Sequence, residues 1–314
     1  METLPPFRLA PWFRTRPWGF QDLDPWYHYK TDGEPIGEVW LTGAMCVADT
    51  GPLQGTSLAD ITKQHRSALL GPGLTGQDFP LLIKILFPKE KLSVQVHPDD
   101  ALAQRYGEPR GKTECWYALD ARPGAQVALG IRPGVTVEQV KAAVHDTSLE
   151  SLLAMVPVEK GDMIFVDAGT VHAMGPGVVV LETQQTSDLT YRMYDYGSGR
   201  QLHLEKAFAA MKLTTRAGKV PPRVVDGHTV LIDEKYFRIE RWPFGTGTAS
   251  SLAAASRVVQ MLFITKGRIQ ISGDGFEPFA VERNQIAVIP SSSSRWSFAD
   301  DESPGIIRIL PAAD

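Results

Sequence analysis

The chain has 314 residues, of which 43% are hydrophobic and 22% charged, and its formal net charge at pH 7 is −4. This composition is typical of a globular protein, and the weak acidity excludes a broad electrostatic attraction to nucleic acid or to an anionic membrane. The two cysteines, Cys46 and Cys115, form no CxxC pair, which argues against a disulfide framework or a cysteine-based zinc knuckle. The N-terminus lacks the unbroken apolar run of a signal peptide, so we expect a cytoplasmic protein without nucleic-acid or membrane partners.

Helical patterns occur in three places, at residues 57–70, in the short segment after residue 98, and at residues 136–156. Short runs rich in valine, isoleucine and leucine dominate from residue 80 onward and are separated by glycine and proline. These runs cover residues 80–87, 91–97, 114–120, 125–131, 162–168 and 177–183. The pattern predicts a mainly β protein, a sandwich or barrel with a few added helices.

A polar KVPP segment near residues 214–224 indicates a domain edge, so we predict one domain over residues 1–218 and a second over residues 219–314. Residues 158–172 align without a gap on residues 281–295, which suggests that the second domain repeats the fold of the first. His172 falls opposite Arg295 in this alignment. The second copy therefore lacks the histidine, and we expect metal chemistry in the first domain alone.

Four polar residues are placed to share one interior. Alternation along KLSVQVH puts Gln95 and His97 on one face of a strand, and alternation along TECWYALD lets Glu114 share that interior from a neighbouring strand. His172 ends GDMIFVDAGTVH, whose spacing resembles the second signature motif of the cupin superfamily. One amide oxygen, two imidazoles and one carboxylate suit zinc or another divalent first-row ion.

Charged residues flank these strands. A hairpin centred on Pro176 would place His172 across from Val180 and Glu182 on the same face, which makes Glu182 the candidate proton carrier. Lys84, Lys112 and Arg192 are the nearby cations, and an anionic substrate such as a phosphosugar would explain cations beside a metal. The strand that carries Lys84 has no clear inward face, so a solvated position is the alternative for that lysine.

Several of these segments are similar to type I mannose-6-phosphate isomerases (phosphomannose isomerases), in their shorter bacterial form. They are RPWGF, IGEVWLTG, LLIKILFPKEKLSVQVHPDD, GKTECWYAL, GDMIFVDAGTVHAMGPGVVVLETQQTSDLTYRMYDYG and LHLEKA. The resemblance implies two cupin-like jelly rolls and one Zn²⁺ per chain on Gln95, His97, Glu114 and His172. It further implies a catalytic Arg192, with Lys112 and Glu182 in proton transfer or substrate contact. RGKTE replaces the NHKPE-type segment of longer members, so a mechanism that needs that histidine does not transfer.

The implied activity is the interconversion of mannose 6-phosphate and fructose 6-phosphate through a cis-enediol, with zinc and Arg192 stabilising the oxyanion. Lys84, Lys112 and Arg192 are the expected substrate contacts. The base is left open between Glu182, Lys112 and a metal-held water, and the choice of monomer or homodimer is open too. A cupin oxygenase and a sugar-binding cupin without turnover are the alternatives, and the cationic residues favour the phosphosugar enzyme.

Overall fold

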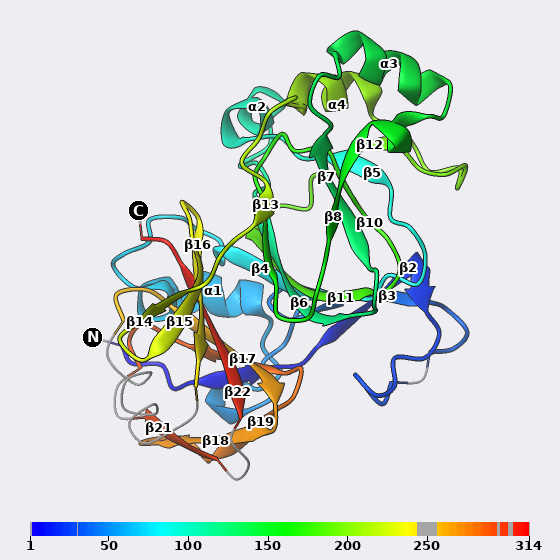
Figure 1. Ribbon diagram of the computed structural model, residues 1–314. Helices are drawn as coiled ribbons and strands as arrows, with labels where there is room; N and C mark the ends of the chain where they lie inside the picture. The colour runs from blue at the N-terminus through cyan, green and yellow to red at the C-terminus, as the bar shows by residue number, and fades with distance from the viewer. Residues whose placement is uncertain (1, 30, 244–255, 294–295, 301–303, 314) are drawn as a thin grey trace.

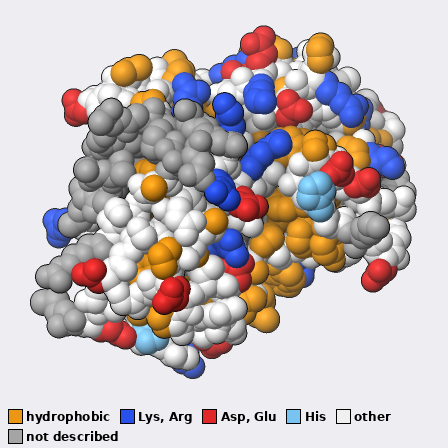
Figure 2. Space-filling model, turned by 90° about the horizontal axis from the view of Figure 1, so that it is seen from below, with side chains coloured by type: hydrophobic (Ala, Val, Ile, Leu, Met, Phe, Trp, Pro, Cys, Tyr) orange, Lys and Arg blue, Asp and Glu red, His pale blue; other side chains and the backbone are white. Residues whose placement is uncertain are grey.

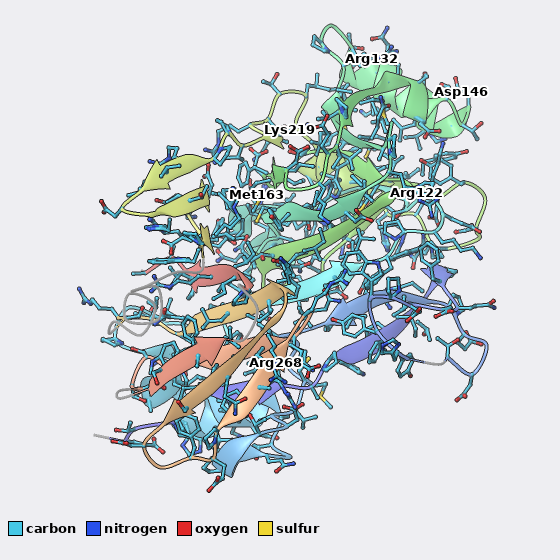
Figure 3. All side chains as sticks on the ribbon, turned by 60° about the horizontal axis from the view of Figure 1, so that its bottom comes forward. Arg122, Arg132, Asp146, Met163, Lys219 and Arg268 are labelled. Atoms are coloured by element: carbon cyan, nitrogen blue, oxygen red, sulfur yellow. The ribbon has the colours of Figure 1, made fainter. Side chains whose placement is uncertain are left out.

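The structure is a computed structural model that describes residues 2–29, 31–243, 256–293, 296–300 and 304–313. These residues form four antiparallel sheets, arranged as two lobes that lie side by side (Figure 1). We call the lobe that contains strands β2 to β13 the N-terminal lobe, and the lobe that contains β14 to β22 the C-terminal lobe. Figure 3 places Arg132 and Asp146 at the helical end of the N-terminal lobe and Arg268 in the C-terminal lobe.

The N-terminal lobe consists of two sheets that face each other. The larger runs in the order β13 (Gly218–Lys219), β9 (Met163–Val166), β6 (Glu114–Ala121), β11 (Val178–Gln185), β4 (Leu81–Leu86), β3 (Ile36–Trp40) and β2 (Trp12–Phe20). The smaller runs in the order β12 (Tyr191–Tyr194), β5 (Val94–Val96), β10 (His172–Met174), β7 (Gln126–Ile131) and β8 (Leu153–Pro157). Trp116 and Val180 of the larger sheet and Val127 and Leu129 of the smaller one share a buried cluster, so the inward faces form a packed core.

Helices cover the outer face of the smaller sheet (Figure 1). They are α2 (Asp100–Arg105), α3 (Val137–His145) and α4 (Leu204–Ala210). The side chain of Asp99 accepts a hydrogen bond from Leu102 N at the start of α2, and Thr136 forms a capping box with Gln139 at the start of α3. These caps explain why the two helices begin where the sequence pattern placed them.

One predicted helix is too long and another helix was missed. The helix expected over residues 136–156 ends at His145, because Thr147 adopts a φ of 66° and the chain then enters the 3₁₀ helix η2 (Leu149–Leu152) and strand β8. Strand β8 pairs with β7, so sheet pairing overrides the helical pattern there. Helix α4 was not predicted. It is short, and its buried residues Ala207 and Ala210 pack against the same sheet.

The C-terminal lobe has a seven-stranded and a three-stranded sheet. The first runs β1 (Phe7–Leu9), β20 (Ile286–Ile289), β17 (Gln260–Lys266), β22 (Gly305–Pro311), β16 (Phe237–Trp242), β15 (His228–Asp233) and β14 (Arg223–Val225), and the second β19 (Phe279–Glu282), β18 (Arg268–Gly273) and β21 (Trp296–Asp300). Strand β1 pairs with β20, so the first residues of the chain complete the C-terminal sheet. The domain boundary at residue 218 stays a prediction. Strand β1 does not follow it, because this strand precedes the boundary in sequence but belongs to the C-terminal sheet.

A single hydrophobic cluster joins the lobes. Ile83 and Ile85 of β4 point away from the interior of the N-terminal lobe and share this cluster with helix α1 (Leu58–Leu70) and with Met261 and Phe263 of β17. A further 3₁₀ turn, η1 (Gly51–Leu53), precedes α1. The lobes are thus packed as one body through an apolar interface. On the face shown in Figure 2, basic and acidic side chains are interspersed, in keeping with the small net charge.

The internal similarity predicted at residues 158–172 and 281–295 coincides with equivalent structure. Strands β9 and β20 occupy matching positions of the two segments, and each follows a residue of positive φ, Gly161 at 93° and Asn284 at 65°. Arg295, the counterpart of His172, lies outside the described residues. The matching strands support a repeated fold, and the absence of a metal site in the second copy stays a prediction.

Candidate active site

Three of the four expected metal ligands meet inside the N-terminal lobe. The ligand atoms of His97, Glu114 and His172 lie within 4.8 Å of one another, and all three residues are buried. His172 pairs directly with Gln95 across β10 and β5, whereas Glu114 begins β6 in the facing sheet. The expectation that Glu114 lies on a strand neighbouring Gln95 is therefore wrong, but the side chains still converge because both strands point into the same interior.

Both imidazoles present Nε2 to the centre of this cluster. His97 Nδ1 lies 2.7 Å from Leu189 O and His172 Nδ1 lies 2.9 Å from Thr170 O, and a carbonyl oxygen only accepts, so each Nδ1 carries the proton. Each Nε2 is 3.5 Å from a Glu114 carboxylate oxygen. Both Nε2 lone pairs therefore face the interior, as metal-ligating histidines require, and His97 Nε2 also lies 3.1 Å from Lys112 Nζ.

Burial keeps the two histidines neutral. It lowers the pKa of His97 well below its ordinary value, and the nearby Lys112 and His172 lower it further. Burial also lowers the pKa of His172, against the opposing effect of Glu114. Burial by itself raises the pKa of Glu114, but Lys112 and His172 outweigh it and hold the pKa below the ordinary value. The cluster therefore combines two neutral imidazoles with one carboxylate.

Gln95 is placed beside this cluster through its amide nitrogen. Its Nε2 lies 3.2 Å from His172 Nε2, and its Oε1 accepts a hydrogen bond from Ser93 Oγ at 3.1 Å. The nitrogen donates into the imidazole lone pair in this orientation. A half-turn of the terminal amide exchanges the two atoms and presents the oxygen, the atom that a metal ligand needs.

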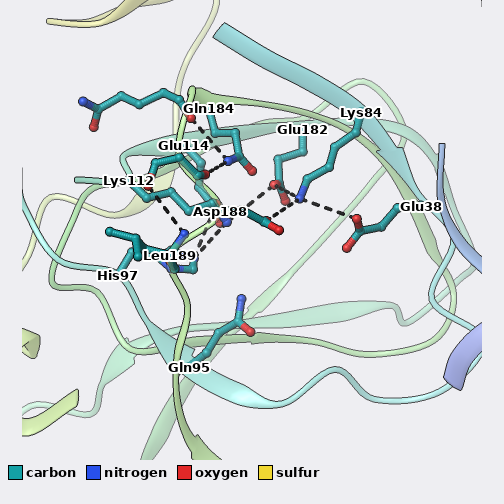
Figure 4. Close-up of polar contacts among 12 residues, drawn as sticks. Glu38, Lys84, Gln95, His97, Lys112, Glu114, Glu182, Gln184, Asp188 and Leu189 are labelled. Carbon is teal, nitrogen blue, oxygen red and sulfur yellow. Dashed lines mark hydrogen bonds and ion pairs between the residues drawn. The ribbon is translucent and has the colours of Figure 1, made fainter. Parts of the chain in front are cut away.

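Buried acidic and basic side chains alternate in a chain that leads away from the cluster (Figure 4). The buried members, in order, are Glu114, Lys112, Glu182, Lys84 and Glu38. The partly exposed Arg16 follows Glu38. Lys112 Nζ lies 2.7 Å from Glu114 Oε2 and 3.7 Å from Glu182 Oε1, while Lys84 Nζ lies 3.2 Å from the same Glu182 oxygen. Lys84 thus points into the interior, and the alternative of a solvated lysine is wrong.

Glu182 lies on β11 opposite Lys84 and Trp116. The hairpin expected around Pro176 does not form, because His172 belongs to the smaller sheet while Val180 pairs with residues of the larger one. Burial and the neighbouring Glu114 raise the pKa of Glu182, and Lys84 and Lys112 oppose that rise. Glu182, the predicted proton carrier, thus lies near the cluster. It reaches the cluster from a strand of the larger sheet and not from a hairpin shared with His172.

Glu38, the last carboxylate in this chain of charges, is held in a fixed position. Arg16 donates to both of its carboxylate oxygens, from Nε at 3.1 Å and from Nη2 at 2.9 Å, and Trp40 Nε1 donates at 2.7 Å. Burial raises the pKa of Glu38, but Lys84 and Arg16 outweigh it and bring the pKa to about 2. Sequence reasoning assigned no role to Glu38 or Arg16, even though RPWGF and IGEVWLTG were noted as family-like segments.

A cavity of about 690 Å³ opens beside this chain of charges. Gln95, Lys112 and Glu182 line its inner end, and basic residues contribute to its walls, namely Arg14, Arg16, Lys84, Arg192, Arg200 and Lys206. Sequence reasoning relied on motifs around the metal ligands. It therefore missed four further lining residues, Arg14, Arg200, His203 and Lys206. A cavity with so many cations suits an anionic ligand.

Arg192 is the cation best placed to receive an anion. Its Nε is buried and has no hydrogen-bond partner among the described residues, whereas Arg200 donates to Asp195 at 2.7 Å. Burial lowers the pKa of Arg192, and the adjacent Arg200 adds to this effect. A buried guanidinium nitrogen without a hydrogen-bond partner is costly unless a ligand supplies the acceptor.

The described residues include no helix of the length and apolarity needed to cross a membrane. Comparisons with known proteins agree with the geometry. Residues 7–131 match the model of the phosphomannose isomerase type I catalytic domain. The chain is 32% identical to a mannose-6-phosphate isomerase of Streptococcus mutans serotype c, covering 90% of this chain and 92% of that protein.

A mannose-6-phosphate isomerase of Bacillus subtilis, ManA, is 35% identical over 88% of this chain and 91% of its own length. The crystal structure of the mannose 6-phosphate isomerase from Bacillus subtilis superposes with a TM-score of 0.83 at 28% identity, covering 98% of this chain and 99% of that one. These findings confirm the predicted mainly β, cupin-like fold. The chain belongs to the type I phosphomannose isomerases, a family of aldose–ketose isomerases.

Proposed function

We propose that this protein interconverts mannose 6-phosphate and fructose 6-phosphate with one Zn²⁺ per chain, bound by Gln95, His97, Glu114 and His172. Membership of the family supports the reaction. The observation that carries the proposal is the meeting of three buried donors beside a cationic cavity, in which Arg192 Nε has no hydrogen-bond partner among the described residues. Together they offer a site for a metal ion next to a site for an anionic sugar.

The donor set fits a zinc ion. The two imidazoles are neutral and direct Nε2 inward, and the buried Glu114 carboxylate places Oε2 near His97 and Lys112. Lys112 forms an ion pair with that same oxygen and would compete with a metal ion for it, with Glu182 as its alternative partner. Two histidines, a carboxylate and an amide oxygen suit Zn²⁺, which when bound supplies a Lewis acid that polarises substrate oxygens.

The isomerisation moves a proton between C1 and C2 of the sugar through a cis-enediol. We propose Glu182 as the group that carries this proton, because burial and Glu114 raise the pKa of its carboxyl and so make the ionised form a stronger base. The two flanking ammonium groups, of Lys84 and Lys112, keep enough of the ionised form available. Lys112 is the alternative carrier, since it lines the cavity and contacts both carboxylates.

Arg192 would bind a negatively charged group of the substrate. Its buried Nε faces no partner among the described residues, so a phosphate or the oxyanion of the enediol would complete its hydrogen bonding. Lys84 also lines the cavity, but its ammonium already contacts Glu182 and Glu38. We therefore propose that Lys84 acts mainly by holding Glu182, and its direct contact with substrate stays a prediction.

We further propose residues 1–218 as the catalytic domain and residues 219–314 as a cupin-like domain without a metal site. Among the residues that the structure describes, the cluster of His97, Glu114 and His172 is the one group suited to a metal ion. We also propose a cytoplasmic enzyme, since both cysteines are unpaired and buried, as a reducing compartment allows.

A coupled assay of fructose 6-phosphate formation from mannose 6-phosphate tests the proposal. The protein is assayed as purified, after removal of metal with a chelator, and after addition of Zn²⁺. We expect turnover to disappear with the metal and to return with zinc. Absence of turnover by the metal-loaded protein would overturn the proposed reaction, and full turnover by metal-free protein would overturn the role of zinc.

A further inference from the structure

A hydrogen-bonded bridge connects the C-terminal lobe to the segment that carries Lys112 and Glu114. It starts at Tyr236, between β15 and β16, whose hydroxyl donates to Asp100 Oδ2 at 2.6 Å. Asp100 is the first residue of α2, in the N-terminal lobe. Lys235 reinforces the contact, because its Nζ lies 2.9 Å from the Tyr236 hydroxyl and 3.6 Å from Asp100 Oδ2.

The second carboxylate oxygen of Asp100 holds the active-site segment. Oδ1 accepts a hydrogen bond from Gly111 N at 2.9 Å and another from Gln185 Nε2 at 3.0 Å. Gln185 Oε1 in turn accepts from Thr113 N at 2.9 Å. The backbone amides on both sides of Lys112 are therefore tied, directly or through one side chain, to the carboxylate that Tyr236 contacts.

The segment also lies tightly against the start of α2. A Cβ atom at Gly111 would come within 2.5 Å of the Asp99 carbonyl carbon and the Pro98 carbonyl oxygen. Lys112 N donates to that same Pro98 oxygen at 3.0 Å. With so close a fit, a displacement of Asp100 moves the backbone of residues 111–113 and with it the Lys112 and Glu114 side chains.

We infer that Tyr236 is a positioning residue for the isomerase reaction: through Asp100 it fixes the backbone that aims Lys112 at Glu182 and Glu114 at the two histidines. The inference deepens the proposed function and rests on it. It also gives the C-terminal lobe a task, because Tyr236 lies beyond residue 218 and no cluster suited to a metal ion is found among the described residues of that lobe. The C-terminal lobe would supply the Tyr236 hydroxyl, which holds Asp100 in position.

The competing explanation is that the Tyr236 hydroxyl only helps to hold the lobes together. Tyr27 offers a matched control, because its hydroxyl donates to Asn284 O across the same pair of lobes, also at 2.6 Å. Tyr27 lines neither the cavity nor the cluster of metal-ligating side chains. The substitutions Tyr236→Phe and Tyr27→Phe each delete one oxygen from an interlobe contact, and only the first touches the bridge to Lys112.

The experiment compares the two variants with the parent protein by kinetics and by amide hydrogen exchange. We expect Tyr236→Phe to lower kcat about tenfold with KM changed less than about twofold, because residues that orient active-site groups have effects of this size. Exchange in a peptide covering residues 108–113 should become faster, while a peptide covering β9 keeps its rate. Tyr27→Phe should leave kcat and the exchange of residues 108–113 as in the parent.

A double-substitution test isolates the role of Asp100. If the bridge acts through its carboxylate, Tyr236→Phe added to Asp100→Asn causes no further loss of kcat beyond about twofold. Full addition of the two losses would overturn the inference, and so would unchanged exchange at residues 108–113 in Tyr236→Phe or an equal effect of Tyr27→Phe. If the parent does not turn over mannose 6-phosphate, the proposed function fails while the exchange result still decides the inference. Asp100→Asn provides the same exchange readout if Tyr236→Phe does not fold.

Discussion

Replacing Glu182 with glutamine tests the proposed proton carrier and has two separable consequences. The glutamine keeps the shape but removes a buried charge whose side chain is 4% exposed. Lys84 would then keep only Glu38 and Asp188, both at 3.9 Å, and Lys112 would keep Glu114 at 2.7 Å. Breaking a buried ion pair in this way is expected to lower the free energy of unfolding by about 3 kcal/mol.

The catalytic consequence is larger than this loss of stability can explain. Loss of a general base lowers the rate by about 10³-fold, which equals about 4 kcal/mol of activation free energy. The coupled assay gives kcat and KM, and urea unfolding gives the stability. We expect kcat of Glu182→Gln to fall by this amount while metal content stays at one ion per chain.

Glu240→Gln is the matched control for Glu182→Gln. Glu240 is equally buried, with 4% of its side chain exposed, and it pairs with Arg238 at 2.6 Å and Arg308 at 3.4 Å in the C-terminal lobe. Its replacement should reduce stability but leave kcat unchanged. If Glu182→Gln keeps kcat within a factor of about ten of the parent, Glu182 is not the proton carrier and the role passes to Lys112 or to water.

Three further predictions concern binding, the metal and pH. Arg192→Ala should lower kcat/KM by about 10²-fold or more in the coupled assay, because it removes an anion-binding charge, while metal analysis finds the ion retained. His172→Ala should lose both turnover and metal, measured in the same two assays, because it removes a ligand. The pKa of Glu38 is about 2 in the folded protein against an ordinary 4.5, so its carboxylate stabilises the fold above pH 4.5 and this stability is lost as the pH falls toward 2. Urea unfolding should therefore show Glu38→Gln less stable than the parent by about 3 kcal/mol at neutral pH, with the difference vanishing near pH 2; a difference that does not depend on pH would contradict the assignment.

The sequence was sufficient where local pattern decides the structure. Strict alternation in KLSVQVH and TECWYALD predicted that Gln95, His97 and Glu114 point inward, and the structure brings His97 and Glu114 together with His172. The helix starts were predictable from capping residues, since Ser57 accepts a hydrogen bond from Asp60 N at the start of α1. Such features depend on a few adjacent residues, which is why one sequence reveals them.

Features that depend on which strands become neighbours were not predictable. The GPG turn indicated a hairpin, yet β10 and β11 enter different sheets, because β10 pairs with β5 and β7 while β11 pairs with β4 and β6. The inward direction of Lys84 could not be read from LLIKILF, where every residue is apolar except the lysine itself. Glu38 and Tyr236 are connected to the site only through contacts with residues distant in sequence, namely Lys84 and Asp100. No local motif therefore identifies them.

The most direct test of the central claim is anomalous diffraction at the zinc absorption edge from crystals of the zinc-loaded protein. We expect one peak per chain, at about 2.0–2.2 Å from Nε2 of both His97 and His172 and from a carboxylate oxygen of Glu114, with the amide oxygen of Gln95 turned toward it. A peak that two or more of these four side chains fail to contact, or a zinc ion bound elsewhere, would contradict it.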